Sequence, residues 1–252
     1  MSTKLPLENI SVLITRPESL ANSLKQLITK AGGTAILYPV IKITPIDDSL
    51  SLRSITDNLS KFDIAIFISP TAVSITLEKI KSLPENLKLA VIGSSTETML
   101  KKYGYQAQII PAEFTTESLL QHLSFQQPNV ATKEIIIFRG EGGRELLGNT
   151  LIQRGANITY AETYRREKNQ LGSLNHDQLN HIDVLTVTSN EGLQNLFDLT
   201  DSESKTMLIN LPLIVPGDRA HRLATQLGFK KIIQASNATD DACIQAISSL
   251  IV

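Results

Sequence analysis

Two stretches of this chain repeat one pattern, and the repetition decides the fold. LAVIGSSTETMLKKYGYQAQIIPAEFTTESLLQHL spans residues 89–123, and LIVPGDRAHRLATQLGFKKIIQASNATDDACIQAI spans residues 213–247. Each reads as an apolar run, a glycine, a helix-like segment, a second glycine beside an aromatic residue, and another apolar run. The first glycine pair, Gly93 and Gly217, and the second, Gly104 and Gly228, are both 124 residues apart. Because no net insertion separates them, we predict two related modules and look for function in the cleft between them.

The duplication extends over most of the chain. VLITR at Val12–Arg16 resembles IIIFR at Ile135–Arg139, with an offset of 123 residues. DIAIFISPTAV, which starts at Asp63, resembles DVLTVTSNEGL, which starts at Asp183, with an offset of 120. Each half therefore carries a full set of elements.

Composition and charge exclude several classes of protein. The chain has 252 residues, of which 42% are hydrophobic, and its net charge is −1, so no basic stripe for nucleic acid is expected. No apolar run approaches the ~20 residues of a membrane span, and the N-terminal residues do not resemble a leader. Cys243 is the single cysteine and is interpreted as a buried apolar residue on a C-terminal helix. These features predict a cytoplasmic protein.

Ten short apolar runs alternate with amphipathic segments along the chain. The runs are SVLIT, TAILYPV, IAIFIS, LAVIG, AQIIP, EIIIFR, NITYAE, VLTVT, PLIVP and KIIQA. Runs of this length fit strands that are covered on both faces, and the alternation with helices indicates an α/β fold with parallel sheets. Ten strands in two modules give five each, the number in a flavodoxin-like sheet flanked by helices.

Polar turns follow the expected strands, where helices begin. Helix N-termini carry about half a unit of positive charge and several unpaired N–H groups, so such turns bind carboxylates or phosphates. Each Ser or Thr can equally be a helix cap, and each arginine an exposed surface charge. The candidate binding residues are Arg16, Ser69, Pro70, Thr71, Ala72, Val73, Gly93, Thr96, Arg139, Ser189, Asn190, Glu191, Gly192 and Thr239.

Other catalytic patterns are missing. RGEGGR, at residues 139–144, lacks the Lys-Ser/Thr of a phosphate-binding loop, and there is no GxSxG elbow. The four histidines have no metal-ligand spacing, so neither a metal nor another cofactor is expected. Tyr164 lies in the ETYRR segment, where its phenol can face the space between modules and donate a proton, or simply pack on a module edge.

Taken together, these residues resemble the uroporphyrinogen-III synthase family over nearly the whole chain. The resemblance rests on VLITRP, AGG, YPVIKI, FISPTAV, VIGSSTETMLKKYG, AEFTTESLL, IIIFRGEGGRELLGNTLIQRGA, ETYRR, TSNEGL, GDRA, LGF and NATDDA, in that order. It implies two flavodoxin-like domains joined by a two-stranded antiparallel linker. Domain 1 would comprise residues 1–38 and 167–252, the linker 39–45 and 161–166, and domain 2 residues 46–160.

The resemblance also implies the reaction. Family members convert linear hydroxymethylbilane into uroporphyrinogen III, with loss of water and inversion of ring D, in heme biosynthesis. Tyr164 matches the tyrosine proposed to assist departure of the hydroxyl, and Thr96 and Thr239 match hydroxyls near the product. The capped turns would hold the eight substrate carboxylates from both sides of the cleft. Asp218 in the PGDRA turn would repel them, so that turn is not expected to bind.

The remaining expectations concern partners and the competing functions. We expect a monomer that contacts no nucleic acid and no membrane, with a transient contact to hydroxymethylbilane synthase left open. The alternative is a non-catalytic cytoplasmic two-domain binding protein for a small anionic ligand. A phosphate-transferring enzyme would need acidic residues at strand ends, but Asp63 and Asp183 precede their strands.

Overall fold

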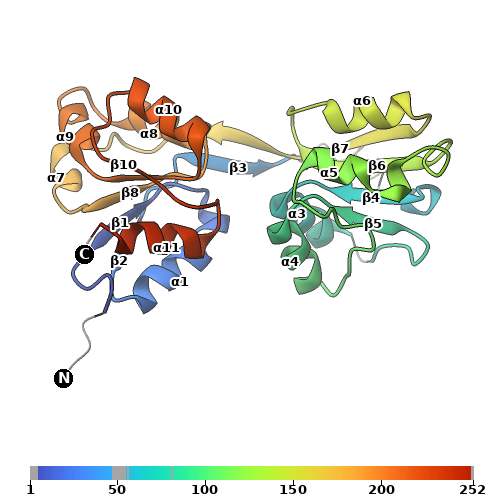
Figure 1. The fold of residues 1–252 in the computed structure, drawn as a ribbon, viewed down its shortest axis with the longest axis horizontal. Coiled ribbons are helices and arrows are strands. Elements are labelled where there is room, and N and C mark those ends of the chain that lie inside the picture. Colours follow the sequence, from blue (N-terminus) through green and yellow to red (C-terminus); the bar gives the residue numbers. More distant parts are fainter. Residues whose placement is uncertain (1–4, 47–54, 56, 81, 251–252) are drawn as a thin grey trace. The chain divides into compact units, whose positions relative to one another are not determined.

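The computed structural model describes residues 5–46, 55, 57–80 and 82–250, and it confirms an α/β fold with two largely parallel sheets (Figure 1). The chain divides into two compact units, residues 1–42 with 167–252 and residues 43–166. The ends of the predicted domain ranges, 1–4 and 251–252, and residues 47–54 lie outside the described residues. Among the described helices, none has the length and apolarity to span a bilayer.

The first unit contains a five-stranded sheet in the order β10-β9-β8-β1-β2. All neighbours in it are parallel. Its central strands are apolar and buried on both faces, as a covered parallel sheet requires. The strands are β1 (Ser11–Ile14), β2 (Thr34–Leu37), β8 (Val184–Thr186), β9 (Leu213–Val215) and β10 (Ile232–Gln234).

The second sheet has the strand order β3-β7-β6-β4-β5. It belongs to the second unit except for Ile41 and Lys42 of β3 and Glu167 and Lys168 of β7, which belong to the first. The strands β7, β6, β4 and β5 are parallel. The pairing of β3 with β7 is antiparallel, because Ile46 N–H donates to Thr163 O while Asn169 N–H donates to Val40 O. The strands are β3 (Ile41–Pro45), β4 (Ile64–Phe67), β5 (Lys88–Val91), β6 (Glu134–Gly140) and β7 (Asn157–Lys168).

The two sheets pair residue for residue as the duplication requires. The pair Val12 with Val184 in one sheet corresponds to Ile135 with Ile64 in the other, at offsets of 123 and 120 residues. In the same way, the isolated parallel bridge between Ala90 and Ile109 corresponds to the pairing of β9 with β10. Each sheet thus combines strands one and two of one half of the chain with strands three to five of the other.

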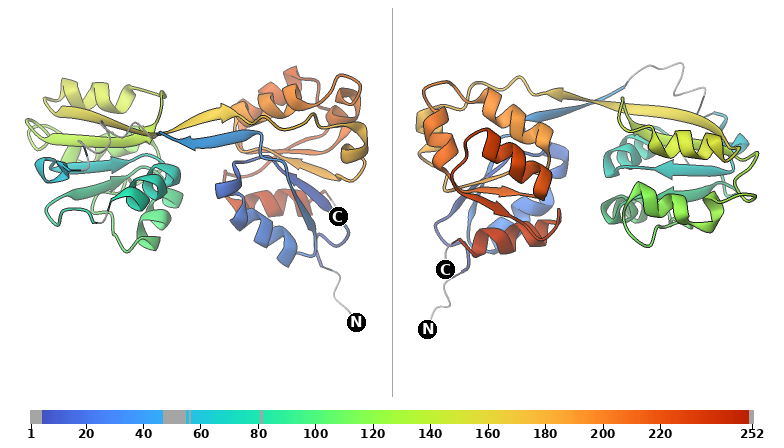
Figure 2. Two further views of the ribbon diagram at one scale, coloured as in Figure 1. Left: turned by 180° about the vertical axis from the view of Figure 1, so that it is seen from behind. Right: turned by 45° about the horizontal axis from the view of Figure 1, so that its top comes forward.

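Helices cover both faces of each sheet (Figures 1 and 2). In the first unit α1 packs with α11 and α8 packs with α10, and in the second unit α6 packs with α5 and α3 packs with α4. The helices are α1 (Asn22–Lys30), α3 (Pro70–Lys79), α4 (Ser94–Lys102), α5 (Thr116–Gln121), α6 (Leu146–Gln153), α7 (His176–Leu179), α8 (Asn190–Leu199), α9 (Lys205–Asn210), α10 (Asp218–Gln226) and α11 (Asp240–Ser248).

Two of the expected apolar runs differ from their expected form. AQIIP, at residues 107–111, contributes only the bridge at Ile109, because its proline and neighbouring turn residues interrupt a ladder. NITYAE and the charged segment after it, expected to be a strand and a connector, form the single strand β7.

The hydrophobic core of the second unit consists of two clusters, one on each face of the sheet. The cluster on the face covered by α3 and α4 contains the stacked rings of Phe67 and Phe138, whose centroids are 4.7 Å apart.

We predict that Gly148→Ala destabilises the second unit. A Cβ at Gly148 in α6 would lie 1.8 Å from Tyr160 Oη and 2.7 Å from Tyr160 Cζ. The ring is held by the Arg139 guanidinium, 4.4 Å from its centroid, so it cannot move aside freely. Alanine favours a helix by about 1 kcal/mol, but the clash costs about 1–3 kcal/mol, so the expected net change is a loss.

Urea unfolding measures this change. Gly172→Ala, where a Cβ would meet nothing within 4 Å, is the matched control and should leave the unfolding midpoint unchanged. A Gly148→Ala protein at least as stable as the parent would contradict the packing of α6 on Tyr160.

Candidate functional site

The turn between β4 and α3 is a fully formed helix N-terminus. Ser69 is the N-cap, and its Oγ accepts a hydrogen bond from the N–H of Ala72 at 3.1 Å. Pro70 has no N–H, and the N–H of Val73 donates to the carbonyl of Ser69. The geometry of a helix start therefore leaves the N–H of Thr71 without a partner inside the helix. The side chains of Thr71, Ala72 and Val73 are buried, so backbone groups and Ser69 form this turn.

Tyr164 places its hydroxyl against this turn. The Oη of Tyr164 lies 3.0 Å from the Oγ of Ser69, and the residue is only 2% exposed. Its ring lies on the backbone of Gly140, where an added Cβ would be 2.7 Å from Tyr164 Cζ. The phenol is thus packed in the core of the second unit, with its polar end at the N-terminus of α3.

A β-bulge in β7 turns Tyr164 to this position. Up to Arg139 and Glu162 the pairing of β6 with β7 keeps one spacing, and then Gly140 pairs with Tyr164, which leaves Thr163 as an extra residue. Successive side chains of a regular strand alternate between faces, yet Ala161 and Tyr164, three residues apart, pack in the same core cluster. The extra residue accounts for this, because a bulge re-aims the side chain that follows it.

The turn between β5 and α4 is held by backbone alone. Gly93 is the N-cap without a side-chain hydrogen bond, and its carbonyl accepts from the N–H groups of Thr96 and Glu97 at 3.1 and 3.0 Å. Thr96 is 1% exposed, so its hydroxyl lies under the turn. Because glycine has no side chain, the N-cap residue places no side chain over the N-terminus of α4.

Arg139 at the end of β6 already holds a carboxylate. Its guanidinium is 3.2 Å from Glu162, and the N–H of Gly142 donates to the same carboxylate oxygen at 3.2 Å. The Arg139 side chain is 7% exposed, and its Nε has no hydrogen-bond partner. Burial raises the pKa of the neighbouring Tyr160 phenol, the Arg139 guanidinium lowers it, and Glu145 raises it further.

The first unit has the matching turn between β8 and α8. Ser189 is the N-cap of α8, and its Oγ accepts from the N–H of Gly192 at 3.0 Å. Asn190 and Glu191 are exposed, and Gly192 is buried. Ser189 follows Ser69 by 120 residues, the offset of this part of the duplication.

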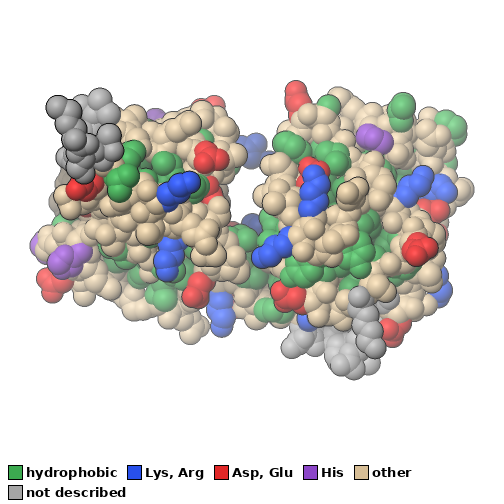
Figure 3. All heavy atoms as spheres, turned by 90° about the horizontal axis from the view of Figure 1, so that it is seen from below, with side chains coloured by type: hydrophobic (Ala, Val, Ile, Leu, Met, Phe, Trp, Pro, Cys, Tyr) green, Lys and Arg blue, Asp and Glu red, His purple; other side chains and the backbone are tan. Residues whose placement is uncertain are grey.

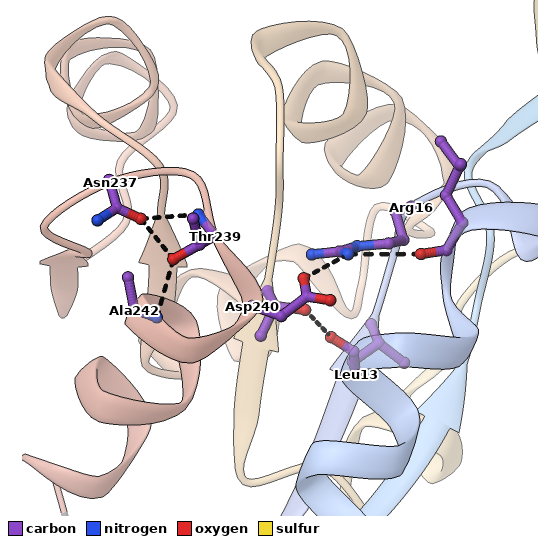
Figure 4. Close-up of polar contacts among 8 residues, drawn as sticks. Leu13, Arg16, Asn237, Thr239, Asp240 and Ala242 are labelled. Carbon is purple, nitrogen blue, oxygen red and sulfur yellow. Dashed lines mark hydrogen bonds and ion pairs between the residues drawn. The ribbon is translucent and has the colours of Figure 1, made fainter. Parts of the chain in front are cut away.

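Arg16 and Thr239 line one hollow at the carboxyl end of this sheet. Figure 4 shows both side chains and the ion pair of Arg16 with Asp240. The hollow is small and is otherwise lined largely by apolar residues at the ends of β8, β9 and β10. Arg16 follows β1 and lies 2.6 Å from the carboxylate of Asp240, the first residue of α11. Thr239 is the exposed N-cap of that helix, and its hydroxyl accepts from the N–H of Ala242 at 3.3 Å. The Nε of Arg16 has no hydrogen-bond partner.

The structure thus brings the predicted residues together in sets within each unit. Ser69 and Tyr164 form one set, and Arg16 and Thr239 form another. The sequence interpretation missed Glu162, Asp240 and Gly140. A signal for the two carboxylates was present, because an arginine follows or ends each of the equivalent strands β1 and β6, and a buried arginine needs a carboxylate nearby.

Asp218, which was not expected to bind substrate, accepts a hydrogen bond from Gln234. Acidic and basic side chains are interspersed on the face shown in Figure 3.

The architecture defines a class, an α/β protein built from two similar halves with helix N-termini at the carboxyl ends of parallel strands. The family model for uroporphyrinogen-III synthase HemD matches residues 22–245, and the chain belongs to this family.

Individual relatives agree with this membership. The chain is 31% identical to the uroporphyrinogen-III synthase of Salmonella typhimurium, over 94% of this chain and 100% of that protein. It is 29% identical to the Escherichia coli synthase at the same coverage of each chain. A solved uroporphyrinogen-III synthetase from Helicobacter pylori has the same fold, with a TM-score of 0.63 at 15% identity over 96% of this chain and 99% of that one. The resemblance inferred from the sequence is therefore confirmed.

We predict that ionisation of the thiol of Cys243, which lines the hollow, lowers the free energy of unfolding at alkaline pH. Burial raises the pKa of this thiol to about 11, with Arg16 lowering and Asp240 raising it. The folded pKa exceeds the unfolded one, so the thiol contributes stability below pH ~9 that is lost as the pH rises to ~11. The loss amounts to at most about 2–3 kcal/mol for a shift of this size.

The measurement is chemical denaturation between pH 8 and pH 11 for the parent and for Cys243→Ala. Other groups titrate in this range, but they are common to both proteins. The difference between the two curves should shrink as the pH rises, and a constant difference would contradict the burial of the thiol.

Proposed function

We propose that this chain converts hydroxymethylbilane into uroporphyrinogen III, with loss of water and inversion of ring D, in heme biosynthesis. Family membership supports the reaction. The observation that carries the proposal is the position of the buried Tyr164 hydroxyl at the N-terminus of α3. Further helix N-termini follow the strands of the other unit, at α8 and α11.

We further propose that both units are flavodoxin-like domains joined by an antiparallel linker. The strand order of the first sheet supports this, because in chain order it reads two, one, three, four, five. The proposed domains are residues 1–38 with 167–252 and residues 46–160. The proposed linker, residues 39–45 and 161–166, includes all of β3 and the middle part of β7.

The substrate's carboxylates are bound by the helix turns of both units. Each turn offers backbone N–H groups at the positive end of a helix, a contribution of about 0.3–1 kcal/mol per carboxylate. The set comprises Ser69 to Val73, Gly93 with Thr96, Ser189 to Gly192, and Thr239. Arg16 and Arg139 also belong to this set. Each would bind a substrate carboxylate through the guanidinium nitrogens that do not take part in its ion pair with Asp240 or Glu162.

The reactivity resides mainly in the substrate. The pyrrole nitrogen contributes its lone pair to a C=N bond as the C–O bond breaks, which gives an azafulvene cation. The electron pair of the C–O bond leaves with the oxygen, which takes the proton of Tyr164 and departs as water. The substituted carbon of ring D then attacks this cation and gives the spiro intermediate. Fragmentation and reclosure complete the inversion. Holding the chain in the folded conformation that favours this attack is the main task of the protein.

A product analysis tests the function. The purified protein is incubated with hydroxymethylbilane generated enzymatically, and isomers I and III are resolved after oxidation. Isomer III above the spontaneous background is the expected result. Only isomer I, formed at the spontaneous rate, would favour a non-catalytic binding protein.

We predict that Tyr164→Phe lowers kcat about 100-fold or more, because a general acid contributes about 10²–10⁴-fold to a rate. The ring keeps its packing on Gly140, so the protein should fold normally. Steady-state kinetics and circular dichroism measure the two effects. A kcat equal to that of the parent would remove the phenol from the mechanism.

A further inference from the structure

We propose that Ser69 is a positioning residue that sets the direction of the Tyr164 proton. This proposal rests on the proposed function, in which Tyr164 donates to the departing hydroxyl. The hydroxyls of Ser69 and Tyr164 lie 3.0 Å apart, and either of them can be the donor in this hydrogen bond.

The two directions of this hydrogen bond differ in what they do with the proton of the phenol. Ser69 Oγ accepts from the N–H of Ala72, so one of its two lone pairs is occupied. If Ser69 donates to Tyr164 Oη, the phenol's own proton is free to reach the substrate. If Tyr164 donates to Ser69, the proton points into the turn and is withheld from the reaction. The first arrangement is the reactive one.

The same arrangement stabilises the charge that the reaction leaves behind. When Tyr164 gives up its proton, the negative charge on Oη lies at the positive end of α3 and accepts the hydrogen bond from Ser69. A hydrogen-bond donor already in place needs no reorganisation as the charge forms. The charge is removed when Oη takes back the proton that the ring carbon releases as the pyrrole becomes aromatic again.

The other unit shows that the capping role alone does not call for a tyrosine. Ser189 caps α8 in the same way as Ser69 caps α3. Beside that turn lie Val40 and Ile41, each 3.9 Å from a Cβ built at Gly192. Aliphatic side chains therefore lie beside this turn, whereas the equivalent turn at Ser69 has the phenol within hydrogen-bond distance.

The fixed position of the ring supports the pairing. Gly140 leaves no room for a Cβ beneath Tyr164, and the bulge at Thr163 directs the ring toward α3. With the ring held on Gly140 and Ser69 held by its helix, little rotamer freedom remains on either side. The contact between the hydroxyls is thus a consequence of two independent constraints.

A double-mutant cycle on the full-length enzyme tests the proposal. Ser69→Ala, Tyr164→Phe and the double variant are compared for kcat and KM with enzymatically generated hydroxymethylbilane. Ser69→Ala should lower kcat about 10–100-fold, because hydrogen bonds to charged groups are worth that factor, with little change in KM. In the Tyr164→Phe background the same substitution should change kcat less than about 3-fold, since coupled residues are not additive.

Two further variants separate positioning from capping. Ser69→Thr keeps a hydroxyl and a cap, and it should recover most of kcat. Thr115→Ala removes the N-cap of α5 in the same unit, where Thr115 Oγ1 accepts from the N–H of Ser118 at 3.1 Å, and should lower the unfolding temperature with kcat unchanged. A Ser69→Ala protein that folds, loses stability like Thr115→Ala and keeps kcat would overturn the proposal.

The remaining outcomes are distinct. If the kcat losses of Ser69→Ala and Tyr164→Phe multiply, Ser69 acts independently of the phenol and this inference fails while the proposed reaction stands. If the parent makes no isomer III, the proposed function itself fails. Should Ser69→Ala not fold, Ser69→Cys takes its place in the same cycle, and losses that multiply there would equally refute the coupling.

Discussion

The exchange of strands between the two halves of the chain is the constraint on which the rest of the structure depends. The interior strand β1 pairs with β2 from its own half and with β8, which lies about 170 residues further along. The strand β6 pairs in the same way with β7 and with β4. Because neither half contains all five strands of a sheet, neither can bury its central strand alone. Formation of both cores therefore requires contacts of very long sequence separation, which are entropically costly to form.

This exchange also determines where polar groups can gather. All strands of a parallel sheet end at one edge, so the turns after strands of different halves meet there. Arg16 comes from the first half and Asp240 from the second, and their ion pair of 2.6 Å joins the halves at the edge of one sheet. Arg139 and Glu162 stand on neighbouring strands of the other sheet. Each pair places an otherwise costly buried guanidinium beside a carboxylate, which is the condition for retaining it there.

The sequence predicts the elements well and their local distortions poorly. Equal glycine offsets and buried apolar runs indicate the α/β class, the sites of helix starts at Ser69 and Ser189, and the relation between the halves. The bulge at Thr163 carries no signal, because one additional residue in the 12-residue strand β7 leaves the apolar pattern ambiguous. The burial of Tyr164 follows from that bulge and from Gly140, 24 residues earlier, so it emerges only in three dimensions. The partners of the arginines were missed because ion pairs between distant residues depend on strand order, not on spacing.

The magnitudes explain how a chain with so little catalytic apparatus can direct a reaction. Favouring one closure of a flexible substrate over another by a factor of 10³ requires about 4 kcal/mol of differential stabilisation. One helix N-terminus supplies about 0.3–1 kcal/mol, so a single turn is insufficient and several acting together are needed. In the proposed reaction a net charge of −1 provides no long-range attraction for a poly-acid, so the selection would fall to these local donors. The duplication places such turns in both units, and of the equivalent turns at Ser69 and Ser189, the turn at Ser69 also carries the phenol that is proposed to move a proton.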